Sequence, residues 1–377
     1  MNKKINILFL NYEYPPLGGG AGNATWYILK EYEKMADLHV TLVTSSTGSF
    51  HMERPSDNII IYYLDIGKSG SLHYQSSKDL LKYTWKAWLF CRRYLKGNHI
   101  DLTHAFFGIP CGLIALLLGK PHIVSLRGSD VPFYNKRFYW LDKLIFKNLS
   151  KVIWCKAVKV VANSEGLKKL AQKSYPEQDI SVIYNGVDTS KFCPPQNKQK
   201  AEKLRLISTG RLIERKGYSY LIEALKGLDN IQLILIGDGD QKEQLQEMAQ
   251  YNKVDVIFAG IVDHDKLPGY LQDADIFILP SLHEGMSNSV LEAMACGLPI
   301  ITTDTGGTRE LVQGNGHIVN KADDKDLRMA VSHLIRKPEL LHKMGIQSRA
   351  LAEKMNWQEV AKSYYENYHK LAKTNNL

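Results

Sequence analysis

The chain has 377 residues, more than one hydrophobic core usually serves, so we expect two domains of similar size. A composition of 44% hydrophobic and 23% charged residues is typical of a folded soluble protein. The formal net charge of +9 favours acidic ligands, an anionic membrane surface or nucleic acid as partners, without choosing among them.

Other bulk features exclude several classes of protein. No run of about 18 uncharged apolar residues occurs, and residues 1–10 lead directly into a strand-like segment. We therefore expect neither a membrane span nor a signal peptide, and a cytoplasmic location. The five cysteines are odd in number and contain no Cys-x-x-Cys pair, which argues against a disulfide framework or a zinc site.

Apolar runs of strand length alternate with helix-period segments along the whole chain, which predicts parallel sheets with helices on both faces. In the first half we expect strands at Ile5–Leu10, Val40–Thr44, Ile59–Leu64, Leu102–Phe106, Ile123–Leu126, Val158–Ala162 and Ile180–Ile183. After a polar, lysine-rich stretch, the second half is expected to supply Leu204–Ser208, Gln232–Ile236, Val256–Ala259, Ile276–Leu279 and Ile300–Thr303. The pattern predicts two doubly wound domains, divided near residue 191. Ligands of such sheets bind outside the carboxyl ends of the strands.

A glycine-rich loop, residues 14–23, directly follows the first expected strand. A dinucleotide-binding fingerprint would need glycine where Asn23 stands, so that test fails. Gly19 and Gly20 still permit a close backbone approach to an anion at the start of the next helix. The alternative is a plain strand-to-helix turn.

A basic and aromatic segment lies at residues 78–96. Its cations are Lys82, Lys86, Arg92, Arg93 and Lys96, and its aromatic residues are Tyr83, Trp85, Trp88, Phe90 and Tyr94. Such a helix could lie on an anionic membrane. The alternative is a half-buried helix with a solvated basic face.

The loop after the first strand of the second half carries Gly210-Arg211 and Lys216-Gly217. It is not a Walker loop, because the Gly-Lys-Ser/Thr order is absent. Arg211 offers a planar fork to phosphate oxygens and Lys216 a point charge, so the two could clamp a diphosphate. The alternative is a solvent-facing helix start.

The most informative segment is Leu279–Pro299, with a strand ending at Pro280, a loop carrying Glu284-Gly285, and a helix from about Asn288 to Gly297. Backbone amides and the positive helix end suit a phosphate. Glu284 and Glu292 would flank that anion and accept hydrogen bonds from sugar or ribose hydroxyls. Alternatively, Ser289-x-x-Glu292 is a capping box in which Glu292 satisfies the helix end.

Asp-x-Asp pairs occur at Asp238/Asp240, Asp263/Asp265 and Asp273/Asp275. Each could be mistaken for a metal-binding pair, but none stands with the rest of such a site. We predict no catalytic metal and no cofactor.

Taken together, the motifs resemble the carboxyl-terminal half of retaining glycosyltransferases of family 4. The matching positions are Arg211 and Lys216, Gly237-Asp238-Gly239, Gly260-Ile261-Val262, Glu284-x7-Glu292 and Thr305-Gly306-Gly307. The resemblance implies the α/β GT-B fold, in which two Rossmann-like domains face a central cleft. The expected domains are an acceptor-binding one, residues 1–191 joined by a returning C-terminal helix at about 357–377, and a donor-binding one, residues 192–356.

The resemblance also implies roles for single residues. Glu284 would contact the donor sugar, Glu292 the ribose, and Arg211 and Lys216 the diphosphate. The loop that contains Gly19 and Gly20 would face the diphosphate and acceptor. The remaining expected donor-site positions are Gly210, Ile261 near the base, Gly285, Met286, Ser287, Asn288, Ser289 and Val290.

The first half departs from the family pattern at two positions. Where the family often has His-x-His, this chain has His104-Ala105-Phe106, and Arg127 stands in the place of the histidine of a His-Gly-x-Asp stretch. We expect His104 to touch the sugar or acceptor as a catalytic candidate, the alternative being a structural histidine. Arg127 and Asp130 would suit an anionic or hydroxyl-rich acceptor.

The sequence thus predicts metal-independent, retaining transfer from a UDP- or GDP-sugar to a hydroxyl. The resemblance implies that the acceptor is a glycan or lipid-linked saccharide of bacterial surface polysaccharide synthesis. We expect the enzyme in the cytoplasm, with an alternative at the inner face of the cell membrane. No nucleic-acid partner is expected. Alternative functions are a GT-B-fold epimerase or phosphorylase and a non-enzymatic nucleotide- or nucleic-acid-binding protein.

Overall fold

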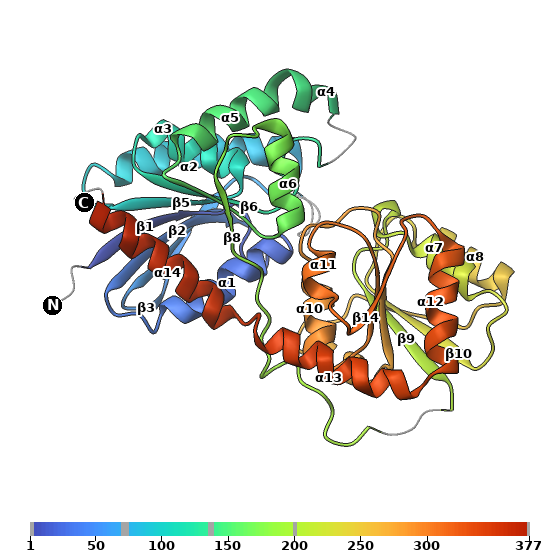
Figure 1. The fold of residues 1–377 in the computed structure, drawn as a ribbon. Helices are drawn as coiled ribbons and strands as arrows, with labels where there is room; N and C mark the ends of the chain where they lie inside the picture. The colour runs from blue at the N-terminus through green and yellow to red at the C-terminus, as the bar shows by residue number, and fades with distance from the viewer. Residues whose placement is uncertain (1–3, 69–74, 135–138, 199–201, 375–377) are drawn as a thin grey trace. The chain divides into compact units, whose positions relative to one another are not determined.

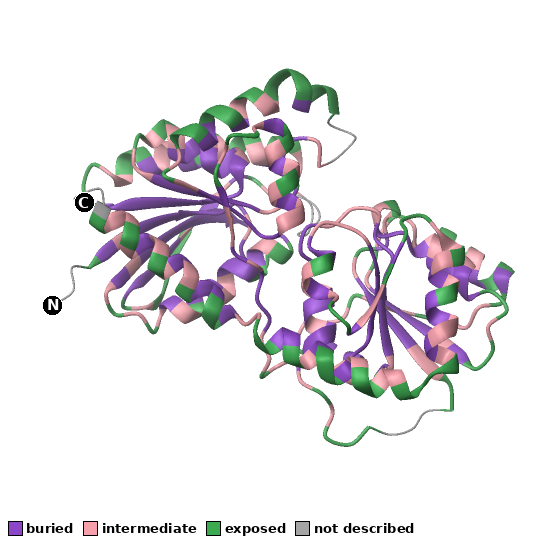
Figure 2. Ribbon diagram, viewed as in Figure 1, coloured by how far each residue is buried: buried purple, intermediate pink, exposed green. Residues whose placement is uncertain are grey.

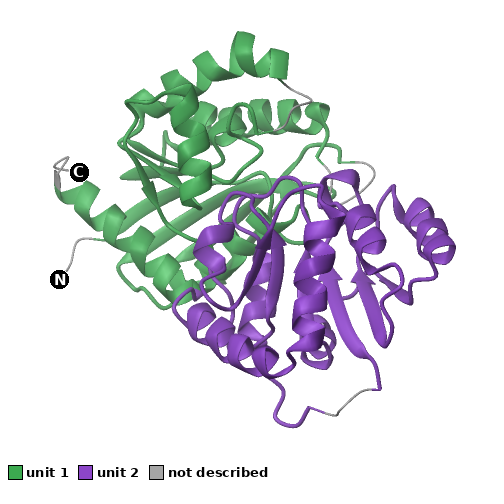
Figure 3. Ribbon diagram, turned by 45° about the vertical axis from the view of Figure 1, so that its right-hand side comes forward, with its two compact units in different colours: residues 1–185, 357–377 green, residues 186–356 purple. Residues whose placement is uncertain are grey.

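The computed structural model describes residues 4–68, 75–134, 139–198 and 202–374. Contacts divide the chain into two compact units, residues 1–185 with 357–377 and residues 186–356 (Figure 3). Each unit is a doubly wound α/β sheet with helices on both faces (Figure 1).

The sheet of the first unit has the strand order β3-β4-β2-β1-β5-β6-β7-β8, parallel except for β3. The strands are β1 Ile5–Leu10, β2 Leu38–Ser46, β3 His51–Ser56, β4 Ile59–Asp65, β5 Leu102–Phe106, β6 His122–Leu126, β7 Lys159–Ala162 and β8 Ile180–Val182. Strands such as β1 are apolar along nearly their whole length because helices cover both faces of the sheet. The strand order of this sheet reverses between the neighbouring strands β1 and β5.

The helices of the first unit are α1 Gly20–Tyr32, α2 Ser77–Tyr94, α3 Leu113–Leu118, α4 Tyr139–Leu141, α5 Lys147–Lys156, α6 Glu165–Ser174 and α14 Trp357–Thr374. Short π-helical turns precede α3, at Gly108–Gly112, and join α4 to α5, at Asp142–Phe146. One face of the sheet packs against α2, α3, α5 and α6, and the other against α1 and α14 (Figure 1).

Helix α14 returns to the first unit, as predicted. Trp357 stacks on Tyr27 of α1, with ring centroids 5.3 Å apart. Tyr364 and Tyr368 are buried between the helix and the sheet. The last helix of the chain thereby completes the core of its first unit.

The second unit has a parallel sheet of order β11-β10-β9-β12-β13-β14. Its strands are β9 Leu204–Thr209, β10 Ile231–Ile236, β11 Val256–Gly260, β12 Ile276–Leu279, β13 Ile300–Thr303 and β14 Gly316–Val319. Its helices are α7 Tyr218–Leu225, α8 Lys242–Asn252, α9 Leu267–Asp273, α10 Asn288–Ala295, α11 Thr308–Leu311, α12 Asp324–Arg336 and α13 Glu339–Glu353. The strand order reverses between the neighbours β9 and β12, and ligands of doubly wound sheets bind at such a reversal.

The division between the units lies after Asn185, not at residue 191 as predicted. The Val187 amide donates to the Met355 carbonyl at 2.8 Å, and Arg349 Nη1 donates to the carbonyls of Thr189 and Phe192. Because these hydrogen bonds are made within the second unit, residues 186–191 belong to it.

Candidate active site

The loops after β9 and β12 meet at the strand reversal of the second unit. Gly217, in the first of these loops, has φ +68°, and a Cβ atom there would lie 2.3 Å from the Pro280 carbonyl oxygen. Only glycine allows this approach. It brings the short 3-10 turn Glu214–Lys216 against the segment that carries Glu284.

Lys216 and Glu284 form a nearly buried ion pair. Lys216 Nζ lies 2.6 Å from Glu284 Oε1, and their side chains are 11% and 13% exposed. Arg215 Nη1 lies 3.5 Å from the same carboxylate oxygen, and the Ser281 hydroxyl donates to it at 3.1 Å. Burial raises the pKa of Glu284, but the charges of Lys216 and Arg215 outweigh it and hold that pKa below its ordinary value. Two cations against one carboxylate leave a net positive site.

The structure brings two of the predicted residues, Lys216 and Glu284, into direct contact. Arg211, on the same loop, is exposed and makes no ion pair among the described residues, so its guanidinium remains available to a ligand. Arg215 stands beside Lys216 in the sequence but was not among the predicted site residues. Its Nη1 also donates to the His283 carbonyl at 2.6 Å, which ties the two loops together.

Helix α10 begins at Asn288, close to the predicted start. Its N-cap is Ser287, whose hydroxyl accepts from the Val290 amide at 3.4 Å. The capping-box alternative is therefore wrong: Ser289 is inside the helix, and Glu292 lies beyond the position from which a side chain could bond to the N-cap amide. Glu292 Oε1 instead lies 3.0 Å from Nε2 of His264, a partner that the sequence analysis did not select.

The remaining expected donor-site residues of the second unit lie in its loops or in the first turn of α10. Gly285, Met286 and Ser287 are buried, and a Cβ at Gly307 would lie 3.0 Å from the Gly285 carbonyl oxygen, so the loop after β13 packs on this segment. Ile261 follows β11 and is 71% exposed, with its side chain accessible to a ligand.

The glycine loop of the first unit differs from the expectation. The Gly19 amide, at the start of α1, donates to Glu13 Oε2 at 3.2 Å. A carboxylate of the protein thus occupies the place predicted for a ligand anion beside Gly19 and Gly20. An anion could use this helix end only after Glu13 moved away.

The catalytic role predicted for His104 is corrected by its environment. The side chain is 0% exposed, Nδ1 lies 2.5 Å from the Tyr368 hydroxyl, and Nε2 lies 2.7 Å from the Ser125 hydroxyl. Burial, helped by the charge of Arg127, lowers the pKa of His104 to about 3. Enclosed and neutral, it joins the sheet to α14 and cannot reach a substrate.

Asp130 also has a structural role in place of the predicted contact with an acceptor. Its Oδ1 accepts from the amides of Arg127 and Gly128, and its Oδ2 from the amide of Gly108. The carboxylate is 8% exposed and braces the loop after β6 against the turn after β5. The half-buried Arg127 has its guanidinium 4.3 Å from the Phe106 ring centroid and donates to Asn185 Oδ1 at 2.6 Å.

Two of the Asp-x-Asp pairs serve local structure. Asp238 Oδ1 accepts from the Gly239 amide, and Asp275 accepts from the Arg205 amide at 2.8 Å. Within the described ranges, no group of three or more His, Cys, Asp or Glu side chains is placed to hold a metal ion.

Two protein-family models match this chain. The model of Glycosyltransferase Family 4 matches residues 18–191, and that of Glycosyl transferases group 1 matches residues 190–351. The chain is a family 4 glycosyltransferase. The two matches together span residues 18–351, and the second includes the Lys216 and Glu284 loops.

Similar sequences and structures cover between about half and nearly all of this glycosyltransferase. An uncharacterized glycosyltransferase of Methanocaldococcus jannaschii is 24% identical, covering 98% of this chain and 99% of the relative. A putative teichuronic acid biosynthesis glycosyltransferase of Bacillus subtilis is 32% identical over 59% of this chain and 57% of the relative. Sucrose-phosphate synthase from Thermosynechococcus elongatus superposes with a TM-score of 0.86 at 20% identity, covering 98% and 100% of the two chains. Anabaena HepE, solved with UDP, has a TM-score of 0.72 at 18% identity, covering 97% and 100%. These structures establish the GT-B fold.

No helix in the described part of this glycosyltransferase has both the length and the apolar character needed to span a bilayer.

Proposed function

We propose that this glycosyltransferase transfers a sugar from a nucleoside-diphosphate sugar, a UDP- or GDP-sugar, to a hydroxyl of a glycan or lipid-linked saccharide, with retention and without a metal. The observation that carries the proposal is the Lys216–Glu284 pair at 2.6 Å, placed at the strand reversal with Arg215 beside it. Cations suit the diphosphate and a carboxylate suits sugar hydroxyls. Solved relatives of the same fold hold UDP or UDP-glucose, which supports a nucleotide-sugar donor.

In the proposed step, the bond between the anomeric carbon and the diphosphate oxygen breaks, and the diphosphate leaves with the electron pair. The acceptor oxygen bonds to the anomeric carbon on the face that the diphosphate leaves, and the acceptor proton passes to a diphosphate oxygen. Arg211, Arg215, Lys216 and the positive end of α10 neutralise the charge that develops on the leaving group. Glu284 orients the sugar, and Glu292 with His264 holds the ribose.

The test is a panel of UDP-, GDP- and ADP-sugars in thermal-shift and saturation-transfer measurements. We expect one donor to stabilise the wild type, and Arg211→Ala and Glu284→Ala to weaken that binding at least tenfold. Arg336→Ala changes an exposed arginine at the end of α12 and serves as the matched control. Binding of no donor, or unchanged binding in both site variants, contradicts the proposal. Loss of transfer on adding a chelator contradicts its metal-independent part.

We also propose that the enzyme works at an anionic membrane surface, through α4, α5 and the turn between them. Trp140 and Leu144 are each 69% exposed, and Ile145 is 53% exposed. The one acidic residue of this segment, Asp142, is buried and accepts from the Phe133 amide. Figure 2 shows α4 as exposed, and α5 with exposed residues alternating with intermediate and buried ones. Exposed apolar side chains among lysines are typical of helices that bind anionic bilayers.

The basic and aromatic segment at residues 78–96 lies almost entirely in α2, Ser77–Tyr94. Its Tyr83 and Cys91 are buried in the core, which agrees with the half-buried alternative. Leu81 and Trp85 are exposed, so α2 offers a smaller apolar surface than the segment from α4 to α5.

A further inference from the structure

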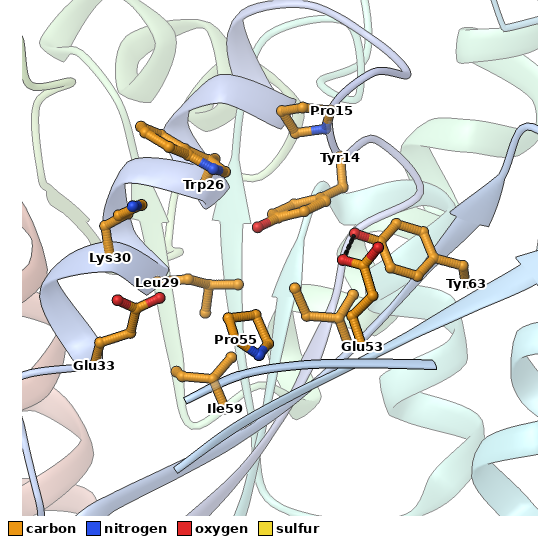
Figure 4. Close-up of a pocket in the computed structure, with 11 residues that line it drawn as sticks. Tyr14, Pro15, Trp26, Leu29, Lys30, Glu33, Glu53, Pro55, Ile59 and Tyr63 are labelled. Atoms are coloured by element: carbon orange, nitrogen blue, oxygen red, sulfur yellow. Dashed lines mark hydrogen bonds between the residues drawn. The ribbon is translucent and has the colours of Figure 1, made fainter. Parts of the chain in front are cut away.

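A pocket of about 470 Å³ lies in the first unit, between α1 and the hairpin of β3 and β4 (Figure 4). Its volume is within the range of about 300–1,000 Å³ that small-molecule sites occupy. Leu29, Ile59 and Ile61 give it an apolar floor, and all three are almost completely buried. Its lining residues all belong to the first unit, whereas the Lys216–Glu284 pair belongs to the second.

Tyr14 carries a hydroxyl that donates to no protein group among the described residues and is accessible from the pocket. The residue is 8% exposed, and its ring projects into the pocket (Figure 4). Among the described residues, no hydrogen bond is made by this hydroxyl. Burial, followed by the charges of Glu53 and Glu33, raises the pKa of Tyr14, so the hydroxyl keeps its proton and is a donor at neutral pH. A ligand oxygen in the pocket could replace solvent as the acceptor of this hydroxyl.

The polar rim favours a ligand with hydroxyl groups and no negative charge. Glu33 has a carboxylate with no hydrogen-bond partner among the described residues, and Glu53 accepts from the Tyr63 hydroxyl at 2.8 Å. Lys30 Nζ lies over the Trp26 ring, 5.0 Å from its centroid. Two carboxylates against one ammonium repel phosphates and uronates but accept hydroxyl protons.

Aromatic rings complete the match to a sugar. Trp26 is half-buried on α1, and Tyr63 and Tyr14 meet edge to face with ring centroids 6.1 Å apart. A pyranose has apolar carbon faces and a rim of hydroxyls, so it fits a pocket with aromatic and aliphatic walls and a few carboxylates.

We propose that this pocket binds a neutral pyranose unit of the acceptor saccharide. The assignment as acceptor rests on the proposed function, whereas the pyranose site itself rests on the pocket alone. Tyr14 and Pro15 begin the loop that continues to Gly19, so the bound sugar lies beside the segment that opens α1. The Tyr14 hydroxyl donates to a sugar oxygen, and Glu33 accepts from a sugar hydroxyl.

The experiment is saturation-transfer NMR and calorimetric titration of the full chain, without donor, against methyl pyranosides. The probes are the methyl glycosides of glucose, galactose and N-acetylglucosamine, with glucuronate and glucose 1-phosphate as anionic comparisons. We expect one neutral glycoside to bind, the anions to bind at least tenfold more weakly, and Tyr14→Phe and Trp26→Ala each to weaken binding at least tenfold.

The control is Tyr12→Phe, which changes an equally buried tyrosine two residues earlier that packs into the opposite core cluster. Tyr14→Phe removes one unpaired hydroxyl, so its thermal midpoint should match the wild type. Glu284→Ala should leave glycoside binding unchanged, which separates this inference from the donor proposal. Binding of no neutral glycoside, or equal binding by wild type and Tyr14→Phe, overturns the inference even if a nucleotide-sugar binds normally.

Discussion

The Arg127 guanidinium stacks on the Phe106 ring, 4.3 Å from its centroid. These are the two positions at which the first unit departs from the histidines of the family pattern. The departures are thus in contact: a cation and an aromatic face occupy the ends of the neighbouring strands β5 and β6. An arginine keeps its charge across the physiological range, whereas a histidine would titrate there.

Arg127→Lys should therefore weaken acceptor binding and leave nucleotide-sugar binding unchanged. Lysine keeps a positive charge but loses the planar fork that both stacks on Phe106 and donates to Asn185. We expect the KM for acceptor to rise several-fold, with the Kd for nucleotide-sugar unchanged. Arg92→Lys, at an arginine over Trp88 on α2, is the matched control. An unchanged acceptor KM would remove Arg127 from the acceptor site.

Replacing both members of the Lys216–Glu284 pair should restore the stability that the Lys216 variant loses, but not the transfer activity. Lys216→Met leaves a nearly buried carboxylate without its closest cation, which costs on the order of 3 kcal/mol in the free energy of unfolding. Adding Glu284→Gln should restore most of that stability while transfer remains at least 100-fold down. Urea unfolding and a donor-transfer assay measure the two quantities. Recovery of activity in the double variant would show that the pair is purely structural.

His104 should make the protein sensitive to acid. Its pKa is about 3 in the folded state, below its ordinary value of 6.5, so the unfolded chain takes up the proton first. The contribution of His104 to the free energy of unfolding is fully present above about pH 6.5. It decreases as the pH falls toward 3, by up to about 1.4 kcal/mol per pH unit. His104→Gln removes this titration, and urea unfolding between pH 7 and pH 5 should give it a shallower decline than the wild type. Parallel curves would argue against a neutral buried histidine.

Variants of Glu292 and Ser287 should distinguish nucleotide binding from helix capping. Ser287→Ala removes the side chain that caps α10 and should cost about 1 kcal/mol in unfolding free energy. Glu292→Gln should leave stability nearly unchanged and weaken nucleotide binding several-fold, because the carboxylate contacts His264 and caps nothing. Calorimetry of unfolding and of UDP or GDP binding tests both effects. A large stability loss in Glu292→Gln would revive the capping role.

The segment from α4 to α5 should govern membrane binding. We expect cosedimentation with phosphatidylglycerol vesicles, much weaker binding to phosphatidylcholine vesicles, and loss on raising salt. Trp140→Ser with Leu144→Ser should reduce binding at least tenfold, since both side chains are exposed. Leu81→Ser with Trp85→Ser on α2 is the matched comparison. If only the α2 variant loses binding, the proposed surface is wrong.

The sequence by itself determined that apolar strands alternate with helices, and where most of the strands lie. Parallel strands covered on both faces must be apolar along their length, so β1, β5, β12 and β13 are visible as short hydrophobic runs. Two strands were missed for physical reasons. The edge strand β3 is exposed and polar and is held by antiparallel pairing with β4. Strand β14 is short and begins at Gly316, which lies against the Ile300 carbonyl.

Local motifs also identified the loops that carry Lys216 and Glu284, because a strand end followed by glycine and charge is a short-range pattern. Only the tertiary structure decided which groups meet. Arg215 at Glu284, His264 at Glu292 and Glu13 at Gly19 are contacts between separate loops or across a turn. The burial of His104 depends on Tyr368, which lies 264 positions later in the chain, and no local pattern could encode that enclosure.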